Sequence, residues 1–132
     1  MITVGMKGNY EVVVNDTNTA FTMKSGSLDV FATPSLVAAL EAAAVDALKG
    51  SLEDGYTTVG CGIAITHTAP SVCGVKVTAT ATVKEASDRK IVFDVVARDE
   101  SGIIGEGEHT RVIVNEEKFM SKAIIRSESN VD

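Results

Sequence analysis

The sequence predicts an α+β fold in which one antiparallel β-sheet packs against one central helix. Two features support this prediction: a nearly all-apolar helical segment around residue 40, and four later segments in which apolar and polar residues alternate. Alternation with a period of two is typical of strands that bury one face. The turns between these segments are short, so consecutive strands are expected to be antiparallel neighbours.

The helix is expected within 30-VFATPSLVAALEAAAVDALKG-50. Thr33 is a suitable N-cap, Pro34 suits the first helical position, and Gly50 is a suitable stop. Apolar residues occur on almost every side of this helix, namely Leu36, Val37, Ala38, Ala39, Leu40, Ala42, Ala43, Ala44, Val45, Ala47 and Leu48. A helix of this kind is buried on most sides, and it is too short to span a membrane.

One strand is expected before the helix and four after it. The expected strands cover residues 6–14, 57–67, 75–84, 91–98 and 103–114, with a polar loop at 15–29 and a short helix at 116–125. Alternation predicts two apolar faces, one formed by Val59, Cys61, Ile63, Ile65 and His67 and the other by Val75, Val77, Ala79, Ala81 and Val83.

The apolar character of the helix also predicts the shape of the sheet. Because the helix is apolar on so many sides, the sheet is expected to curl around it, which is the hot-dog arrangement. The curled sheet leaves part of the helix and its own edges uncovered. We therefore expect a homodimer with twofold symmetry.

Length and composition restrict the function. The 132 residues fit one domain spanning residues 1–132. A net charge of −6 argues against a nucleic-acid partner and an anionic membrane surface. We expect no signal peptide, because the segment MITVGMKGNY has no apolar stretch of that kind, and no run approaches the length of a membrane span. Cys61 and Cys73 are too few for a disulfide framework, so they are expected to be reduced thiols in the cytosol, and a catalytic cysteine is the less favoured alternative.

Glu41 is the one carboxylate in the middle of the apolar helix. A buried carboxylate without a partner costs several kcal/mol or has a raised pKa. One interpretation is structural, with Glu41 at a gap to solvent or in an ion pair. The other is a catalytic carboxylate in a pocket at the subunit interface.

Three further residues have both a structural and a functional interpretation. His67 ends an apolar strand face, where it is either a core residue or an acid–base group, and Gly60 in the same strand could leave a backbone N–H free for a ligand carbonyl. Thr33 is explained by helix capping alone, but it also places a hydroxyl two turns before Glu41. Arg111 shares strand parity with His109, so it is either solvated or directed inward.

Together, the segments VFATPSLVAALEAAA, VGCGIAITHTAP and EGEHTRVIVNEEKF resemble the fluoroacetyl-CoA thioesterase-like proteins of the hot-dog fold. The resemblance covers roughly residues 5–120, with three separated motifs in matching order and spacing. The family pattern has a Thr at the start of the central helix, a Glu eight residues later and a His twenty-six residues beyond it. Thr33, Glu41 and His67 match that spacing, and the family's Gly and Arg fall on Gly60 and Arg111.

The resemblance implies hydrolysis of an acyl-CoA thioester, with Thr33, Glu41 and His67 as the catalytic residues. Glu41 would be the nucleophile or general base, hydrogen-bonded to Thr33, and His67 the acid–base group. Gly60 N–H would hold the thioester oxygen, and Arg111 would lie near the acyl group or the coenzyme. No metal and no separate cofactor are expected, because coenzyme A enters as part of the substrate.

One departure from the family concerns the substrate. The fluoroacetate-specific members carry an aromatic lid on a longer insertion before the central helix, whereas this chain has the shorter 21-FTMKSGSLDVF-31. A general short- or medium-chain acyl-CoA is therefore expected. Two alternatives remain: a non-catalytic acyl-CoA-binding protein, and an enoyl-CoA hydratase or dehydratase, although ATPSL lacks the His and the Asp or Asn usual at that helix start.

Overall fold

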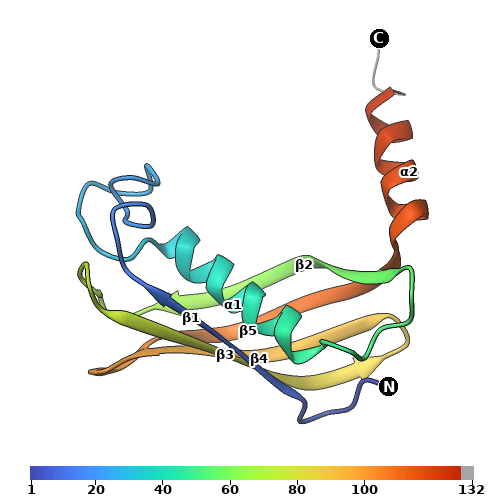
Figure 1. The fold of residues 1–132 in the computed structure, drawn as a ribbon, viewed down its shortest axis with the longest axis horizontal. Coiled ribbons are helices and arrows are strands. Elements are labelled where there is room, and N and C mark those ends of the chain that lie inside the picture. Colours follow the sequence, from blue (N-terminus) through green and yellow to red (C-terminus); the bar gives the residue numbers. More distant parts are fainter. Residues whose placement is uncertain (129–132) are drawn as a thin grey trace.

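The computed structural model describes residues 1–128. In chain order the elements are β1 (Lys7–Val13), α1 (Thr33–Ala47), β2 (Tyr56–His67), β3 (Lys76–Ser87), β4 (Lys90–Asp99), β5 (Gly102–Asn115) and α2 (Glu116–Glu128). Figure 1 shows α1 lying across one face of a curled sheet, with α2 projecting away from it. The predicted order of strands and helices is confirmed, as is the hot-dog fold.

The sheet has five antiparallel strands in the order β1-β3-β4-β5-β2. The hairpins β3-β4 and β4-β5 are the neighbours that their short turns predicted. β1 and β2 are the two edge strands. One side of β2 therefore presents backbone N–H and C=O groups that no strand of this chain pairs.

The core lies between α1 and the concave face of the sheet. Leu36, Leu40, Ala43 and Ala44 of α1 are buried against aliphatic side chains of β3 and β4 and against Phe93. Each large apolar side chain removed from water in this way stabilises the fold by roughly 1.5–3 kcal/mol. The buried face predicted for β3 is confirmed at Val77, Ala79, Ala81 and Val83.

The side of α1 that faces away from the sheet is not covered by residues 1–128. Ala38 is exposed and Val45 is 51% exposed. An apolar helix face without a cover agrees with the expectation that the curled sheet alone does not enclose the helix.

The predicted N-cap is wrong. Ala32 occupies the N-cap position, and no side chain caps the helix. Thr33 is instead the first helical residue, and its hydroxyl bonds to another element. The helix ends at Ala47, and Gly50 follows with a positive φ of 79°.

The predicted face of β2 is wrong in its first half, because the strand contains a β-bulge. Gly60 pairs with Arg111 and Gly62 with Thr110, so Cys61 is the extra residue. A bulge reverses the parity of the residues before it. Thr58 and Gly60 therefore face α1 together with Ile63, Ile65 and His67, whereas Val59 and Cys61 do not.

No helix within residues 1–128 is long and apolar enough to cross a membrane.

Candidate active site

Two of the candidate residues, Thr33 and His67, contact each other directly. Thr33 opens α1 and His67 ends β2, and Thr33 Oγ1 lies 2.8 Å from His67 Nδ1. The hydroxyl that the sequence suggested as a helix cap thus orients an imidazole. This hydrogen bond fixes the ring and leaves Nε2 for another partner.

His67 Nε2 is buried and has no hydrogen-bond partner among the described residues. Burial lowers the pKa of His67, and an interaction with the backbone of Ala69 offsets part of this shift. The neutral ring is therefore favoured near pH 7. Beside it lies a cavity of about 290 Å³, lined by residues that include Phe31, Thr33 and Pro70. A buried polar atom without a partner is uncommon in proteins, so Nε2 marks His67 as a residue with an unmet hydrogen bond.

Glu41 lies two turns further along α1, close to the bulged part of β2. A Cβ added at Gly60 would lie 2.7 Å from Glu41 Oε2 and 3.3 Å from a guanidinium nitrogen of Arg111. Glycine at this position is what allows the carboxylate to approach the strand so closely. The Glu41 side chain is 41% exposed, so solvent or a ligand can reach the carboxylate.

Arg111 is the charge partner of Glu41, with Nη1 3.5 Å from Oε2. Two hydrogen bonds to Thr58 hold the guanidinium: Nε donates to Thr58 Oγ1 at 2.9 Å, and Nη2 donates to Thr58 O at 3.0 Å. Arg111 is only 7% exposed. The alternative of a solvated strand arginine is therefore wrong, because the parity of β5 turns Arg111 inward together with His109.

Burial and charge act in opposite directions on Arg111. Desolvation lowers its pKa, and the carboxylate of Glu41 raises it. Arginine stays protonated in proteins, so a permanent cation stands beside Glu41. Such a cation attracts the carboxylate and holds it close to β2.

His109 is a site residue that the sequence analysis did not assign. It is 2% exposed, and Nδ1 lies 2.8 Å from Gly62 O. A carbonyl oxygen only accepts, so Nδ1 carries the proton and Nε2 is free to accept from Arg111 Nη1 at 3.2 Å. Burial is the main cause that lowers the pKa of His109, and Arg111 lowers it further. The sequence did contain one sign of this role, because His109 and Arg111 lie two residues apart and therefore on the same face of a strand.

Within one chain the candidate residues form two clusters rather than one. Thr33 and His67 are hydrogen-bonded to each other, whereas Glu41 is grouped with Gly60 and Arg111. Eight helical residues separate Thr33 from Glu41, which is about 12 Å along the axis. Among residues 1–128 of a single chain, Glu41 makes no hydrogen bond to Thr33, so that bond stays a prediction for the assembled protein.

The two clusters have complementary chemistry. One offers a neutral imidazole with a free nitrogen beside a cavity, and the other offers an accessible carboxylate with a fixed cation and a strand glycine. Carboxylate and imidazole are the groups that carry general acid–base catalysis. In the described part of the chain, no three potential ligands come together to hold a metal ion.

Comparison with known proteins places the chain in a family. The profile of the family described as fluoroacetyl-CoA-specific thioesterase (FlK) matches residues 14–117. The chain belongs to this family. The fluoroacetyl-CoA thioesterase of Streptantibioticus cattleyicolor is 38% identical over 94 residues, which cover 71% of this chain and 68% of that protein.

Solved structures agree with the family profile. The chain is similar to the fluoroacetyl-CoA thioesterase FlK in a mutant complexed with acetyl-CoA, with a TM-score of 0.89, 31% identity and coverage of 95% of this chain and 98% of that one. It is also similar to a Thermus thermophilus hypothetical protein described as a thioesterase superfamily member, with a TM-score of 0.90, 25% identity and coverage of 98% and 96%. These similarities confirm the predicted family and fold and, at the level of the family, the enzyme class of thioester hydrolases.

Proposed function

We propose that this protein is an acyl-CoA thioesterase that hydrolyses a short- or medium-chain acyl-CoA to the free acid and coenzyme A. The catalytic residues in this proposal are Thr33, Glu41 and His67, at the interface of a homodimer. The observation that supports it best is the buried, unpartnered Nε2 of His67 beside a cavity, in a chain that also offers the accessible carboxylate of Glu41.

The proposed reaction assigns one task to each group. Glu41, held beside Arg111, either takes a proton from the attacking water or attacks the thioester carbonyl carbon itself. Gly60 N–H donates to the carbonyl oxygen as negative charge develops on it. When the C–S bond breaks, the proton removed from water passes through His67 to the departing thiolate, so that the imidazole is neutral again at the end of the reaction. Thr33 keeps the imidazole in place through the 2.8 Å hydrogen bond.

The dimer in this proposal is formed along the free edge of β2. If two copies of β2 pair in antiparallel fashion about an axis at residue 64, residues 63 and 65 lie opposite each other on the same face, and the bulge at Cys61 brings Gly60 opposite the partner subunit's His67. Glu41, which lies against Gly60, then faces the imidazole of the partner subunit. The unpaired strand edge and the uncovered face of α1 both support an interface here.

The substrate class follows from the segment before α1. Phe31 is 1% exposed and belongs to the core, and Phe21 is 64% exposed on the surface. Phe31 is therefore not free to close over the thioester as an aromatic lid, and Phe21 does not cover a site in this structure. A general short- or medium-chain acyl group is therefore proposed rather than selectivity for fluoroacetyl-CoA. The proposed compartment is the cytosol, supported by the two exposed free thiols Cys61 and Cys73.

A thiol-release assay over a panel of acyl-CoA esters from two to ten carbons tests the proposal. Release of free coenzyme A by the native protein, and its loss in Glu41→Ala and His67→Ala, is the expected result. If no ester is hydrolysed but acyl-CoA binds tightly, the protein is an acyl-CoA-binding module and the catalytic proposal is wrong.

A further inference from the structure

A second pocket lies away from the catalytic groups, where α2 leaves the sheet. It has a volume of about 260 Å³, and its lining includes Tyr56 of β2, Arg89 of the β3–β4 turn, Asn115 at the end of β5, and Lys118, Phe119 and Lys122 of α2. We call it the α2 pocket. Figure 1 shows α2 rising from the end of β5 beside the start of β2.

The α2 pocket is cationic in an acidic protein. The whole chain has a net charge of −6, yet three cations and no carboxylate line the described part of this pocket. Within residues 1–128, none of Arg89, Lys118 and Lys122 forms an ion pair. Three cations gathered without counter-charges favour an anion in the space between them.

The backbone holds the parts of the α2 pocket in place. Arg89 O accepts from Ile113 N at 2.8 Å, and Glu116 N donates to Gly55 O at 2.9 Å. These bonds tie the β3–β4 turn and the start of α2 to their neighbouring strands. A pocket whose walls are already fixed loses less entropy on binding a ligand.

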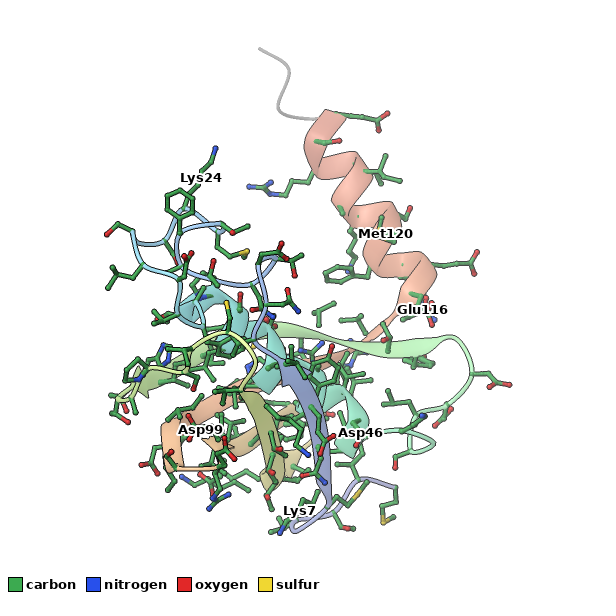
Figure 2. All side chains as sticks on the ribbon, turned by 60° about the vertical axis from the view of Figure 1, so that its left-hand side comes forward. Lys7, Lys24, Asp46, Asp99, Glu116 and Met120 are labelled. Atoms are coloured by element: carbon green, nitrogen blue, oxygen red, sulfur yellow. The ribbon has the colours of Figure 1, made fainter. Side chains whose placement is uncertain are left out.

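The first turns of α2 direct the cations to one side. Asn115 Oδ1 accepts from Lys118 N at 3.0 Å, which caps the helix. Residues 118 and 122 then share a side, because positions i and i+4 are neighbours on a helix surface, and Phe119 lines the pocket from the adjacent side of the helix. The acidic Glu116 does not line the pocket. Figure 2 shows Glu116 at the base of α2, with Met120 one turn above it.

We propose that the α2 pocket binds the 3′-phosphorylated ADP part of the acyl-CoA substrate. Arg89, Lys118 and Lys122 pair with its phosphates, and the adenine stacks on Tyr56 or Phe119. Charged hydrogen bonds to phosphate are the strong kind, and aromatic side chains are the usual stacking platforms for bases. This inference rests on the proposed thioesterase function, and it assigns the part of the substrate that the catalytic groups do not touch.

The position of the α2 pocket fits the length of the substrate. Tyr56 precedes Gly60 by four residues on β2, which is about 13 Å along the strand. The pantetheine arm of coenzyme A is an extended, flexible chain that separates the thioester from the phosphates. With the thioester carbonyl at Gly60, the arm runs along the start of β2 and delivers the nucleotide to α2.

The test compares two substrates that differ only in the nucleotide: acetyl-CoA and S-acetylpantetheine. In the double variant Lys118→Ala/Lys122→Ala, KM for acetyl-CoA rises about tenfold or more with kcat unchanged. The kinetics of S-acetylpantetheine stay as in the native protein. The matched control is Lys7→Ala/Lys76→Ala, which removes two exposed lysines from β1 and β3 and leaves both substrates unaffected.

The outcomes separate the two proposals. If the native protein hydrolyses neither thioester nor any longer acyl-CoA of the panel described above, the thioesterase proposal fails. If it hydrolyses both and the α2 variant changes neither KM, or changes both alike, the nucleotide assignment is wrong. A binding titration with adenosine 3′,5′-bisphosphate needs no turnover: we expect binding that weakens about tenfold in the α2 variant, and no binding to the native protein contradicts the assignment.

Discussion

Arg111 Nη1 lies 3.5 Å from Glu41 Oε2, with the cation buried and the carboxylate partly exposed. The protein thus fixes the charge partner and leaves the carboxylate free to act. Thr58 and His109 hold the guanidinium through three further hydrogen bonds. A fixed cation attracts the carboxylate beside it and keeps that carboxylate in place.

Replacement of Arg111 tests this relationship. Arg111→Met removes the cation and leaves Thr58 without its donor, so kcat/KM is expected to fall about ten- to a hundredfold. Arg111→Lys keeps the charge but cannot make the same set of hydrogen bonds, so an intermediate loss is expected. The measurement is steady-state kinetics on acetyl-CoA, with urea unfolding as the control for stability. Native-like kinetics in Arg111→Met would show that Glu41 needs no fixed cation.

Gly60→Ala should affect activity more than stability. The added Cβ would meet Glu41 Oε2 at 2.7 Å, and this atom is the end of a flexible side chain that can move. A displaced catalytic carboxylate costs up to about a hundredfold in rate. Gly62→Ala is the matched control in the same strand, because its Cβ would meet nothing within 4 Å. Equal activities of the two variants would contradict the proposed place of Glu41.

Two variants of His109 separate its two hydrogen bonds. His109→Gln can retain an acceptor for Arg111, whereas His109→Asn can retain the donor to Gly62 O. If His109 acts by positioning Arg111, we expect kcat in the Gln variant to exceed that in the Asn variant about tenfold. The measurement is kcat and KM on acetyl-CoA for both variants. A purely structural role would lower kcat in both variants alike, in step with a loss of unfolding free energy.

The free energy of unfolding should fall as the pH is lowered through the ordinary histidine range. Burial lowers the folded-state pKa of His67 and His109 below the ordinary histidine value of 6.5. As the pH falls below 6.5, the unfolded chain takes up these protons before the folded chain does, so stability present above that pH is lost. Urea unfolding at pH 7.5 and pH 5.5 measures the loss. In His109→Gln the loss should be smaller, and an unchanged loss would mean that His109 does not contribute.

The fold was predictable because each element carries its own pattern. The α1 segment is apolar on nearly every side, and β3 alternates strictly, with Val77, Ala79, Ala81 and Val83 all buried. Short turns then left few ways to order β3, β4 and β5. Such periodicity can be recognised in a single sequence, because burial selects apolar residues at regular positions along the whole element.

The details of the site were less predictable because they depend on contacts between distant segments. The bulge at Cys61 reverses the parity of the start of β2, and only the pairing with β5 reveals it. Thr33 resembles a helix cap in the sequence, but its hydroxyl bonds to His67, 34 residues away. Arg111 gave no sign of burial, because the groups that compensate its charge come from α1 and β2.

The central claim is that Glu41 of one subunit and the partner subunit's His67 form one catalytic site, and mixed dimers test it most directly. Glu41→Ala and His67→Ala are each expected to be inactive. After the two are unfolded together and refolded, half of the dimers are mixed, and each mixed dimer contains one intact site and one doubly altered site. We predict recovery of about a quarter of the native thiol-release rate. If the mixture stays as inactive as its two components, although mixed dimers have formed, the site does not combine the two residues across the interface.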